Sequence, residues 1–144
     1  MKVVVQRVKS SSCTVDGKIT GKIDNGFMLL VGFTNGDDET NVYDMVKKII
    51  NLRIMDDDNH VMNKSILDTK GSILSISQFT LYADTKKGNR PSYINAMKGE
   101  EAVKLYDLFN RELRKYVPVY EGIFGADMQI SLINDGPVTI ILER

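Results

Sequence analysis

The amino-acid sequence predicts an α+β fold, in which a curved mixed or antiparallel sheet, or a barrel-like core, packs with two main helices. Two observations support this prediction: many short apolar or alternating runs are separated by turn dipeptides, and two segments repeat apolar residues at helical spacing without strict alternation of helix and strand. The chain has 144 residues, 42% of them hydrophobic. Residues 1–144 are therefore expected to form a single domain that buries a core without disulfides or metal.

Extended segments fill the first third of the chain. The runs are residues 3–15, 19–23 and 27–31, and the turn dipeptides between them are Asp16-Gly17 and Asn25-Gly26. Asp-Gly is a favoured two-residue hairpin turn. The third run, Phe-Met-Leu-Leu-Val, is apolar throughout and therefore indicates a buried strand.

A first helix is predicted after Asp38, which is a suitable N-cap residue, and it should end near Leu52. Its apolar residues recur at intervals of three and four, and they are Val42, Met45, Val46, Ile49 and Ile50. The polar run 56–59 follows, between two short apolar runs. This pattern predicts a hairpin or short loop with a solvated tip.

A long strand is predicted from Ile73 to Leu81, and the polar residues 84–91, with Gly and Pro among them, predict a loop after it. A second helix begins at Glu100 and stops before Pro118. One face of this helix carries Ala102, Leu105, Tyr106, Phe109 and Leu113, and its last turn should carry Arg114 and Lys115.

The last part of the chain predicts two further strands. Residues 128–132 alternate apolar and polar side chains, and residues 138–142 are mostly apolar. Residues 134–137, Asn-Asp-Gly-Pro, have the composition of a turn between these strands.

Charge and apolar patterning limit the possible functions. Lys plus Arg number 19 and Asp plus Glu number 19, so no bulk positive field can hold nucleic acid and any RNA contact must be local. No apolar stretch approaches the roughly 20 residues that span a bilayer, and the first residues lack the apolar region of a signal peptide. Cys13 is the only cysteine, so no intrachain disulfide can form. We expect a cytoplasmic protein without a membrane partner.

Side chains suited to catalysis are scarce. His60 is the only histidine and lies beside the acidic run, where a surface or packing role is expected, while Cys13 has the pattern of a small core residue. The usual zinc ligands are missing, and neither a calcium loop nor a phosphate-binding glycine motif is present. We expect no metal and no cofactor.

One segment combines groups that could bind or react. Ser77, Gln78 and Thr80 supply hydroxyl and amide groups near a predicted strand end, and a loop with Lys86, Lys87 and Arg90 follows. An ordinary strand and a solvated loop would have the same composition. Thr80 as a nucleophile would need an adjacent base, and none is visible in the sequence. An enzyme built on this segment must rely on backbone groups, bound water or the substrate itself.

Two long motifs resemble the signature of D-aminoacyl-tRNA deacylases. The first is SQFTLYAD at 77–84 followed by KGNRPS at 87–92, and the second is NDGPVT at 134–139. Three shorter stretches agree with it, at 125–128, 6–8 and 51–54. The resemblance covers essentially the whole chain, and two long motifs in the right order make it specific.

The resemblance implies an enzyme that hydrolyses the ester between tRNA and a D-amino acid or glycine, releasing free amino acid and tRNA. Glycyl-tRNA mischarged on alanine tRNA would be a substrate, and L-aminoacyl-tRNA would be rejected. A homodimer with active sites at the subunit interface is implied. In that dimer Gly136 and Pro137, joined by a cis peptide bond, enter the partner's active site, and Arg7 anchors this motif.

The resemblance also implies how the residues share the work. Ser77, Gln78, Phe79 and Thr80 form the catalytic segment, and the backbone N–H groups of Phe79 and Thr80 are the candidates for stabilising the oxyanion. The 2′-hydroxyl of the terminal adenosine would help to move the proton, with Thr80 as a covalent nucleophile as the rival mechanism.

Contacts with tRNA are expected from Lys86, Lys87 and Arg90, while the effect of Asn89 on RNA contact stays open. The alternative, from a different class of function, is that the protein is a non-catalytic RNA-binding dimer module. Hydrolysis of D-Tyr-tRNA by the purified protein would separate the two functions.

Overall fold

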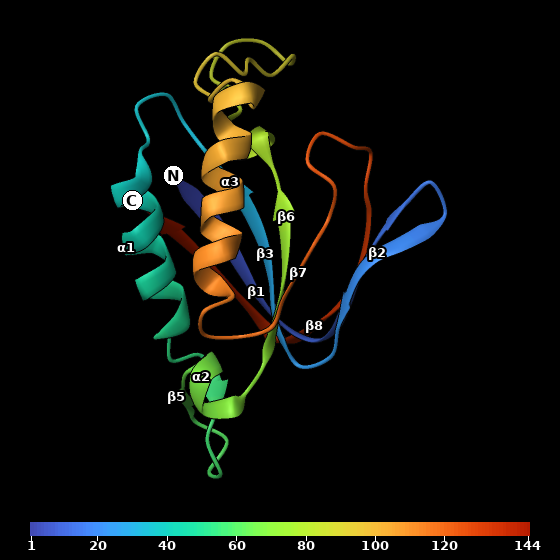
Figure 1. Cartoon of the computed structure of the whole chain (residues 1–144), viewed down its shortest axis with the longest axis vertical. Helices are drawn as coiled ribbons and strands as arrows, with labels where there is room; N and C mark the ends of the chain where they lie inside the picture. Colours follow the sequence, from blue (N-terminus) through green and yellow to red (C-terminus); the bar gives the residue numbers. More distant parts are fainter.

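The computed structural model of the protein describes all residues, 1–144, and Figure 1 shows how its strands and helices are arranged. The strands are β1 (Lys2–Val15), β2 (Lys18–Ile23), β3 (Gly26–Gly32), β4 (Met55–Asp56), β5 (Met62–Lys64), β6 (Ser72–Ser77), β7 (Val119–Glu121) and β8 (Gln129–Glu143). The helices are α1 (Glu39–Ile50), α2 (Ile66–Thr69) and α3 (Gly99–Leu113), with a 3₁₀ turn, η1, at Phe79–Tyr82.

The sheet curves around β1. Residues 2–8 of this strand pair antiparallel with β3, and residues 11–15 pair antiparallel with β2. On its other edge, β1 pairs antiparallel with β8 along most of the length of β1. β3 pairs in parallel with β6, and β6 pairs in parallel with β7. Because β1 has different neighbours along its two halves, the mixed sheet bends into a nearly closed, barrel-like form (Figure 1). The predicted α+β class is confirmed.

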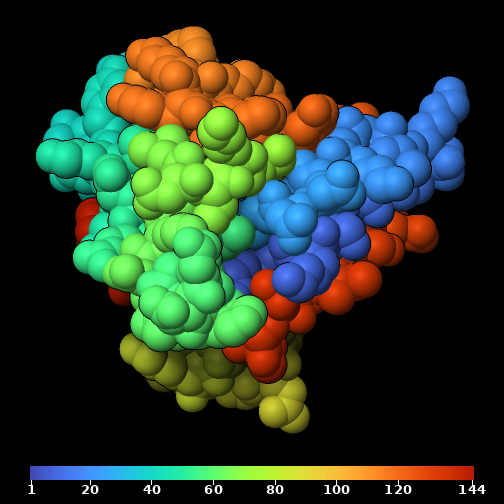
Figure 2. All heavy atoms as spheres, turned by 90° about the horizontal axis from the view of Figure 1, so that it is seen from below, coloured from blue at the N-terminus to red at the C-terminus, as the bar shows by residue number.

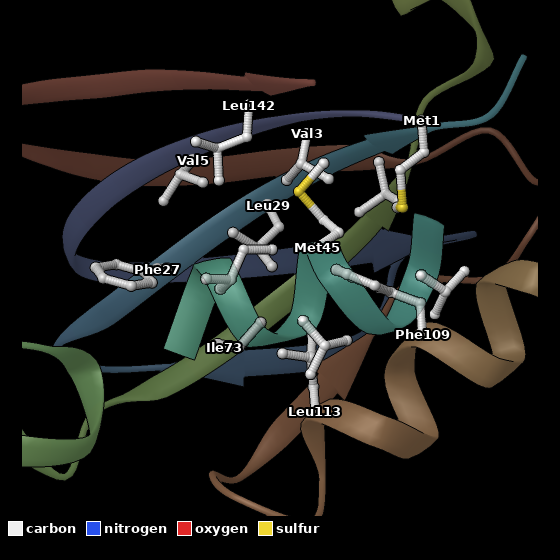
Figure 3. Packing of buried hydrophobic residues seen from close by; sticks show 14 of the residues in the cluster. Met1, Val3, Val5, Phe27, Leu29, Met45, Ile73, Phe109, Leu113 and Leu142 are labelled. Carbon is white, nitrogen blue, oxygen red and sulfur yellow. The ribbon is translucent and has the colours of Figure 1, made fainter. Parts of the chain in front are cut away.

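The larger hydrophobic core lies between the sheet and the two long helices. In Figure 3 the side chains of Val3, Leu29 and Ile73 from the sheet gather with Met45 of α1 and Phe109 of α3. Each fully buried side chain of this size stabilises the fold by about 1.5–3 kcal/mol. This core therefore fixes both helices against one face of the sheet.

A smaller apolar cluster occupies the opposite face of β3 and β6. Phe27 and Leu29 of β3 face the helices, whereas Met28 faces the smaller cluster, as expected from the two-residue period of a strand. Cys13 is fully buried in this cluster, which confirms its role as a small core residue.

Local signals placed the first helix well. The carboxylate of Asp38 accepts hydrogen bonds from the N–H groups of Thr40 and Asn41, so Asp38 is the N-cap that the sequence predicts. The helix ends at Ile50, close to the predicted Leu52. The turn at Asp16-Gly17 is also confirmed, with φ values of 49° and 75°.

The turn predicted at 134–137 is wrong. Residues 129–143 form one continuous strand, and the four residues 135–138 bulge out of its pairing with β1, between the pairs Val8–Asn134 and Gln6–Thr139. Pro137 has no N–H group to donate to a neighbouring strand, and Gly136 has a φ of 121° that glycine adopts without strain. The residues that looked like a chain reversal therefore form a bulge.

The other differences come from short elements with weak local signals. β6 ends at Ser77 and not at Leu81, because the chain turns into η1 after Gln78. The helix α2 and the strand β7 have four and three residues, too few to produce a periodic pattern. The second helix ends at Leu113, so Arg114 caps it and Lys115 lies beyond it, in place of the predicted last turn.

Candidate functional site

A cavity of about 500 Å³ lies where β3 and β6 end, beside the first turn of α3 and the segment that follows β7. It is lined mainly by apolar groups, namely Val31, Gly32, Phe33, Ile76, Ser77, Gln78, Phe79, Met97, Gly99, Ala102, Phe124, Gly125, Ala126, Asp127, Met128 and Ile130. Its volume falls in the range of small-molecule sites. The structure thus brings Ser77, Gln78 and Phe79 together at one cavity.

The floor of this cavity is shaped by the backbone at the end of β6. The N–H of Gln78 donates to the carbonyl of Val31 at 2.7 Å, and η1 begins at the next residue. A Cβ on Gly32 would lie only 2.8 Å from the carbonyl oxygen of Gln78, so glycine is needed for the close approach.

Phe79 and Thr80 present their backbone N–H groups at the start of η1. The first N–H groups of a helical turn have no acceptor within that turn, so these two donors are free for another partner. The side-chain amide of Gln78 donates to the Thr80 hydroxyl, and Thr80, unlike Ser77, Gln78 and Phe79, is not part of the cavity lining. The site therefore offers backbone donors beside a hydroxyl that already accepts a hydrogen bond.

Ionisable groups contribute little to the cavity. Asp127 is the only charged residue in the lining, and its exposed carboxylate makes no hydrogen bond or ion pair that would hold it at a reacting atom. Tyr82 in η1 has its pKa raised to about 12, first by burial and then by the charges of Asp37 and Glu143. Its phenol therefore stays neutral near pH 7 and cannot serve as a base.

An aromatic pair and a basic loop adjoin the rim. The ring of Phe79, 57% exposed, meets the ring of Tyr93 edge to face, with centroids 5.0 Å apart. Backbone hydrogen bonds of 2.7 and 2.9 Å join Asp84 to Ser92 and close the loop between them. The predicted tRNA-binding residues lie exposed on this loop, outside the cavity lining, and they are Lys86, Lys87 and Arg90.

The bulge on β8 forms a second exposed site. Gly136 and Pro137 are exposed, their peptide bond is cis, and neither residue lines the cavity of its own chain. Arg7, which is 6% exposed, donates from Nε to the carbonyl of Asp135 at 3.2 Å. At the base of the bulge, the side-chain amide of Asn134 donates to Gln6 at 2.6 Å.

Sequence reasoning missed several of these groups. Met97 and Phe124 lie in segments without a regular pattern, although the Gly-Ala-Asp-Met stretch at 125–128 was one of the resembling motifs. Asp56 was placed in a solvated run, yet its carboxylate lies 2.8 Å from Nη1 of Arg7. Neither the position of Met97 and Phe124 at the cavity nor the ion pair of Asp56 with Arg7 has a signature in local sequence, because each brings together residues that are far apart in the chain.

The remaining candidates lie away from the cavity. His60 is exposed in the turn between β4 and β5, with a φ of 59°, and is not part of the lining. No group of three or more His, Cys, Asp or Glu side chains lies close enough together to hold a metal ion. No helix is both long and apolar enough to cross a membrane.

The site is thus a mainly apolar cavity with a single charged residue, beside an exposed aromatic pair and a basic loop. The chain belongs to the D-Tyr-tRNA(Tyr) deacylase family, whose model matches residues 4–143. It is accordingly a hydrolase of D-aminoacyl-tRNA.

Two solved structures resemble the chain along its full length. One, described as a c-Myc DNA unwinding element binding protein, superimposes with a TM-score of 0.95 at 43% identity, covering 100% of this chain and 99% of the other. Another, described as a probable eukaryotic D-amino acid tRNA deacylase, superimposes with a TM-score of 0.84 and covers 98% of this chain and 97% of its own. It shares only 16% identity, so this second likeness establishes the fold alone.

Proposed function

We propose that the protein is a chiral proofreading enzyme of the cytoplasm, which hydrolyses D-aminoacyl-tRNA and glycyl-tRNA, including glycine mischarged on alanine tRNA, and spares L-aminoacyl-tRNA. One observation carries the proposal: free backbone donors at Phe79 and Thr80 stand at the start of η1, beside a cavity that lacks any positioned acid or base. Such a site suits an ester that is already activated and whose own hydroxyl can assist the reaction.

In the proposed reaction, water attacks the ester carbonyl and the tRNA 3′-oxygen leaves. The N–H groups of Phe79 and Thr80 stabilise the oxyanion, a role in which losing one donor typically costs about 10²- to 10³-fold in rate. Ser77 and Gln78 line the floor and orient the terminal nucleoside. The 2′-hydroxyl of that nucleoside moves the proton, since no histidine, cysteine or lysine lines the cavity.

Selection between D and L substrates is assigned to the backbone of the bulge. In the proposed homodimer, Gly136 and Pro137 of one subunit enter the cavity of the other, where main-chain carbonyls accept the substrate's α-ammonium group. An L residue would direct its β-carbon against this backbone, whereas a D residue would direct its side chain to solvent. Glycine has no β-carbon, so it is admitted.

Exposed apolar side chains support the dimer. Ile133 and Ile141 on β8 are 61% and 64% exposed, and Phe79 at the cavity rim is also exposed. Covering such groups is favourable at about 25 cal/mol per Å². In addition, Gly136 and Pro137 do not line the cavity of their own chain, so a second copy of the chain is needed to place them in a cavity.

The acceptor end of tRNA is proposed to leave the cavity past Phe79 and Tyr93. Aromatic faces stack on unpaired bases, and the exposed cations of the 84–92 loop are suited to the adjoining phosphates. The near-zero net charge is consistent with contacts confined to this region.

A comparison of D-Tyr-, Gly- and L-Tyr-tRNA under single turnover tests the proposal. Hydrolysis of D-Tyr- and Gly-tRNA is expected, with L-Tyr-tRNA spared at enzyme concentrations that exhaust the D form. Replacing the terminal 2′-hydroxyl of D-Tyr-tRNA with hydrogen should abolish most of the rate. Equal hydrolysis of the D and L forms would refute chiral selection, and full activity on the 2′-deoxy substrate would refute the assigned proton transfer.

Binding without catalysis is the second candidate function. The structural relative at 43% identity is described as a DNA unwinding element binding protein, which favours nucleic-acid binding by this fold. A binding module would protect the ester of D-Tyr-tRNA or leave its spontaneous hydrolysis unchanged. The same assay therefore separates the two functions.

A further inference from the structure

The guanidinium of Arg7 joins two segments that lie far apart in the sequence. Its Nη1 donates to the carbonyl of Ile54 and to the carboxylate of Asp56, each at 2.8 Å. Its Nε donates to the carbonyl of Asp135 at 3.2 Å and lies 3.3 Å from the Asp135 carboxylate. Its Nη2 faces Gly136, since a Cβ built there would lie 3.2 Å from this atom. Arg7 is thus a bridge from residues 54–56 to the bulge.

The Asp56 end of this bridge belongs to an ordered hairpin. Asp56 pairs with Met62 across β4 and β5, and the carboxylate of Asp57 accepts from the N–H groups of Asn59 and Val61. Figure 2 shows this hairpin, in green, packed beside the red C-terminal strand. The backbone at Asp56, whose carboxylate meets Arg7, is therefore fixed by the hairpin.

The ion pair between Arg7 and Asp56 matters because the Arg7 guanidinium is charged and buried. Arg7 is almost completely buried, and a buried cation is costly unless carboxylates and carbonyls surround it. Asp56 and Asp135 supply the two carboxylates, and the mostly exposed Lys9 shares the second at 3.4 Å. Without Asp56, the guanidinium would keep a charged partner only on the bulge side, and its position would shift towards Asp135.

We propose that Asp56 is a positioning residue for substrate selection: it fixes Arg7, and Arg7 sets where the Gly136 backbone stands. Asp56 touches no substrate and acts only through Arg7. This inference rests on the proposed role of Gly136 and Pro137 in the partner's cavity. The β4–β5 hairpin, which contributes no residue to the cavity lining, would thus support the position of Gly136 and Pro137.

The experiment compares Asp56→Asn with Asp58→Asn. Asp58 lies on the same hairpin, its side chain is 96% exposed, and its one partner is Lys64 at 2.9 Å. Single-turnover rates are measured with D-Tyr- and L-Tyr-tRNA, and tRNA affinity is measured separately. For Asp56→Asn we expect the D rate to fall by about 10- to 100-fold and the L-to-D rate ratio to rise, with unchanged tRNA affinity. Asp58→Asn should match the wild type.

Rescue and folding controls complete the design. Asp56→Glu restores the carboxylate and should return the L-to-D ratio to near the wild-type value, which a general loss of stability would not do. If Asp56→Asn did not fold, as judged by circular dichroism, the same two rates would be measured on Asp56→Ser. A folded variant with the wild-type D rate and L-to-D ratio would overturn the positioning role. A wild-type protein that fails to prefer D-Tyr-tRNA would instead overturn the proposed function.

Discussion

The cavity and the bulge on β8 are held in place by different kinds of interaction. The cavity is enclosed mainly by apolar side chains and by backbone, with Asp127 as its only charged residue. The bulge is held by charges, since the guanidinium of Arg7 lies 2.8 Å from the carboxylate of Asp56 and 3.3 Å from that of Asp135. The cavity is shaped by the larger fold, whereas the bulge depends on a few directional contacts.

This difference suggests that rate and selectivity can be altered separately. A change in the cavity floor should lower the rate for every substrate, because all of them share the ester and the terminal nucleoside. A change in the bulge should also alter the ratio between D and L substrates. Four variants, one of them with three substitutions, test this separation, from the largest expected effect to the smallest.

Gly136→Ala should have the largest effect. The φ of 121° disfavours any side chain, and a Cβ would lie 2.8 Å from Cγ2 of Val138 and 3.2 Å from Nη2 of Arg7. Single-turnover hydrolysis of D-Tyr-tRNA should fall by about 10²-fold or more, with a higher L-to-D ratio. Gly17→Ala is the control, because Gly17, in the turn between β1 and β2, also has a positive φ, 75°, but no atom lies within 4 Å of its Cβ position. Equal losses in the two variants would refute a special role for the bulge.

Gly32→Ala should damage the cavity alone. Its Cβ would press on the carbonyl of Gln78 and displace the η1 turn, including the N–H groups of Phe79 and Thr80. The D-Tyr-tRNA rate should fall by about 10- to 100-fold with an unchanged L-to-D ratio. Gly99 belongs to the same lining, but a Cβ there would lie 3.9 Å from its nearest neighbour, Cε1 of Phe124. The rate of Gly99→Ala should therefore stay close to that of the wild type. A changed ratio in Gly32→Ala would show that the two regions are not separable.

Neutralising the loop should weaken tRNA binding without changing the chemistry. A variant with Lys86, Lys87 and Arg90 replaced by glutamine should raise the tRNA concentration for half-maximal rate. It should also flatten the log–log salt dependence of binding by about 2 units, as expected for three lost phosphate contacts. Replacing Lys47 and Lys48, exposed on α1, should leave that slope unchanged. An unaltered slope in the loop variant would place the RNA path elsewhere.

Thr80→Ala should have the smallest effect. The Thr80 hydroxyl accepts from the Gln78 amide and has no base beside it, so removing it should lower the single-turnover rate by less than about 10-fold. A loss of about 10³-fold, the scale of a catalytic group, would favour the covalent mechanism over proton transfer by the substrate.

The sequence predicted the elements whose signals are local. Asp38 with its apolar repeat indicated α1, Asp16-Gly17 indicated the first hairpin, and the apolar run 27–31 indicated a buried strand. Turn dipeptides, caps and periodicity depend on residues a few positions apart, so one sequence is enough to recognise them. By resemblance, the sequence also pointed to the segments at 77–80 and 134–139 and to the deacylase family.

Tertiary structure alone decided how those segments are used. Residues 135–138 form a bulge because β1 continues to pair on both sides of them, over a separation of more than 120 residues. β6 stops at Ser77 because the end of β3 binds Gln78 and leaves no room beside Gly32. Asp56 meets Arg7 only because the fold brings residues 54–56 beside this residue of β1. Contacts of this kind depend on the three-dimensional path of the chain, so no local pattern of residues could have predicted them.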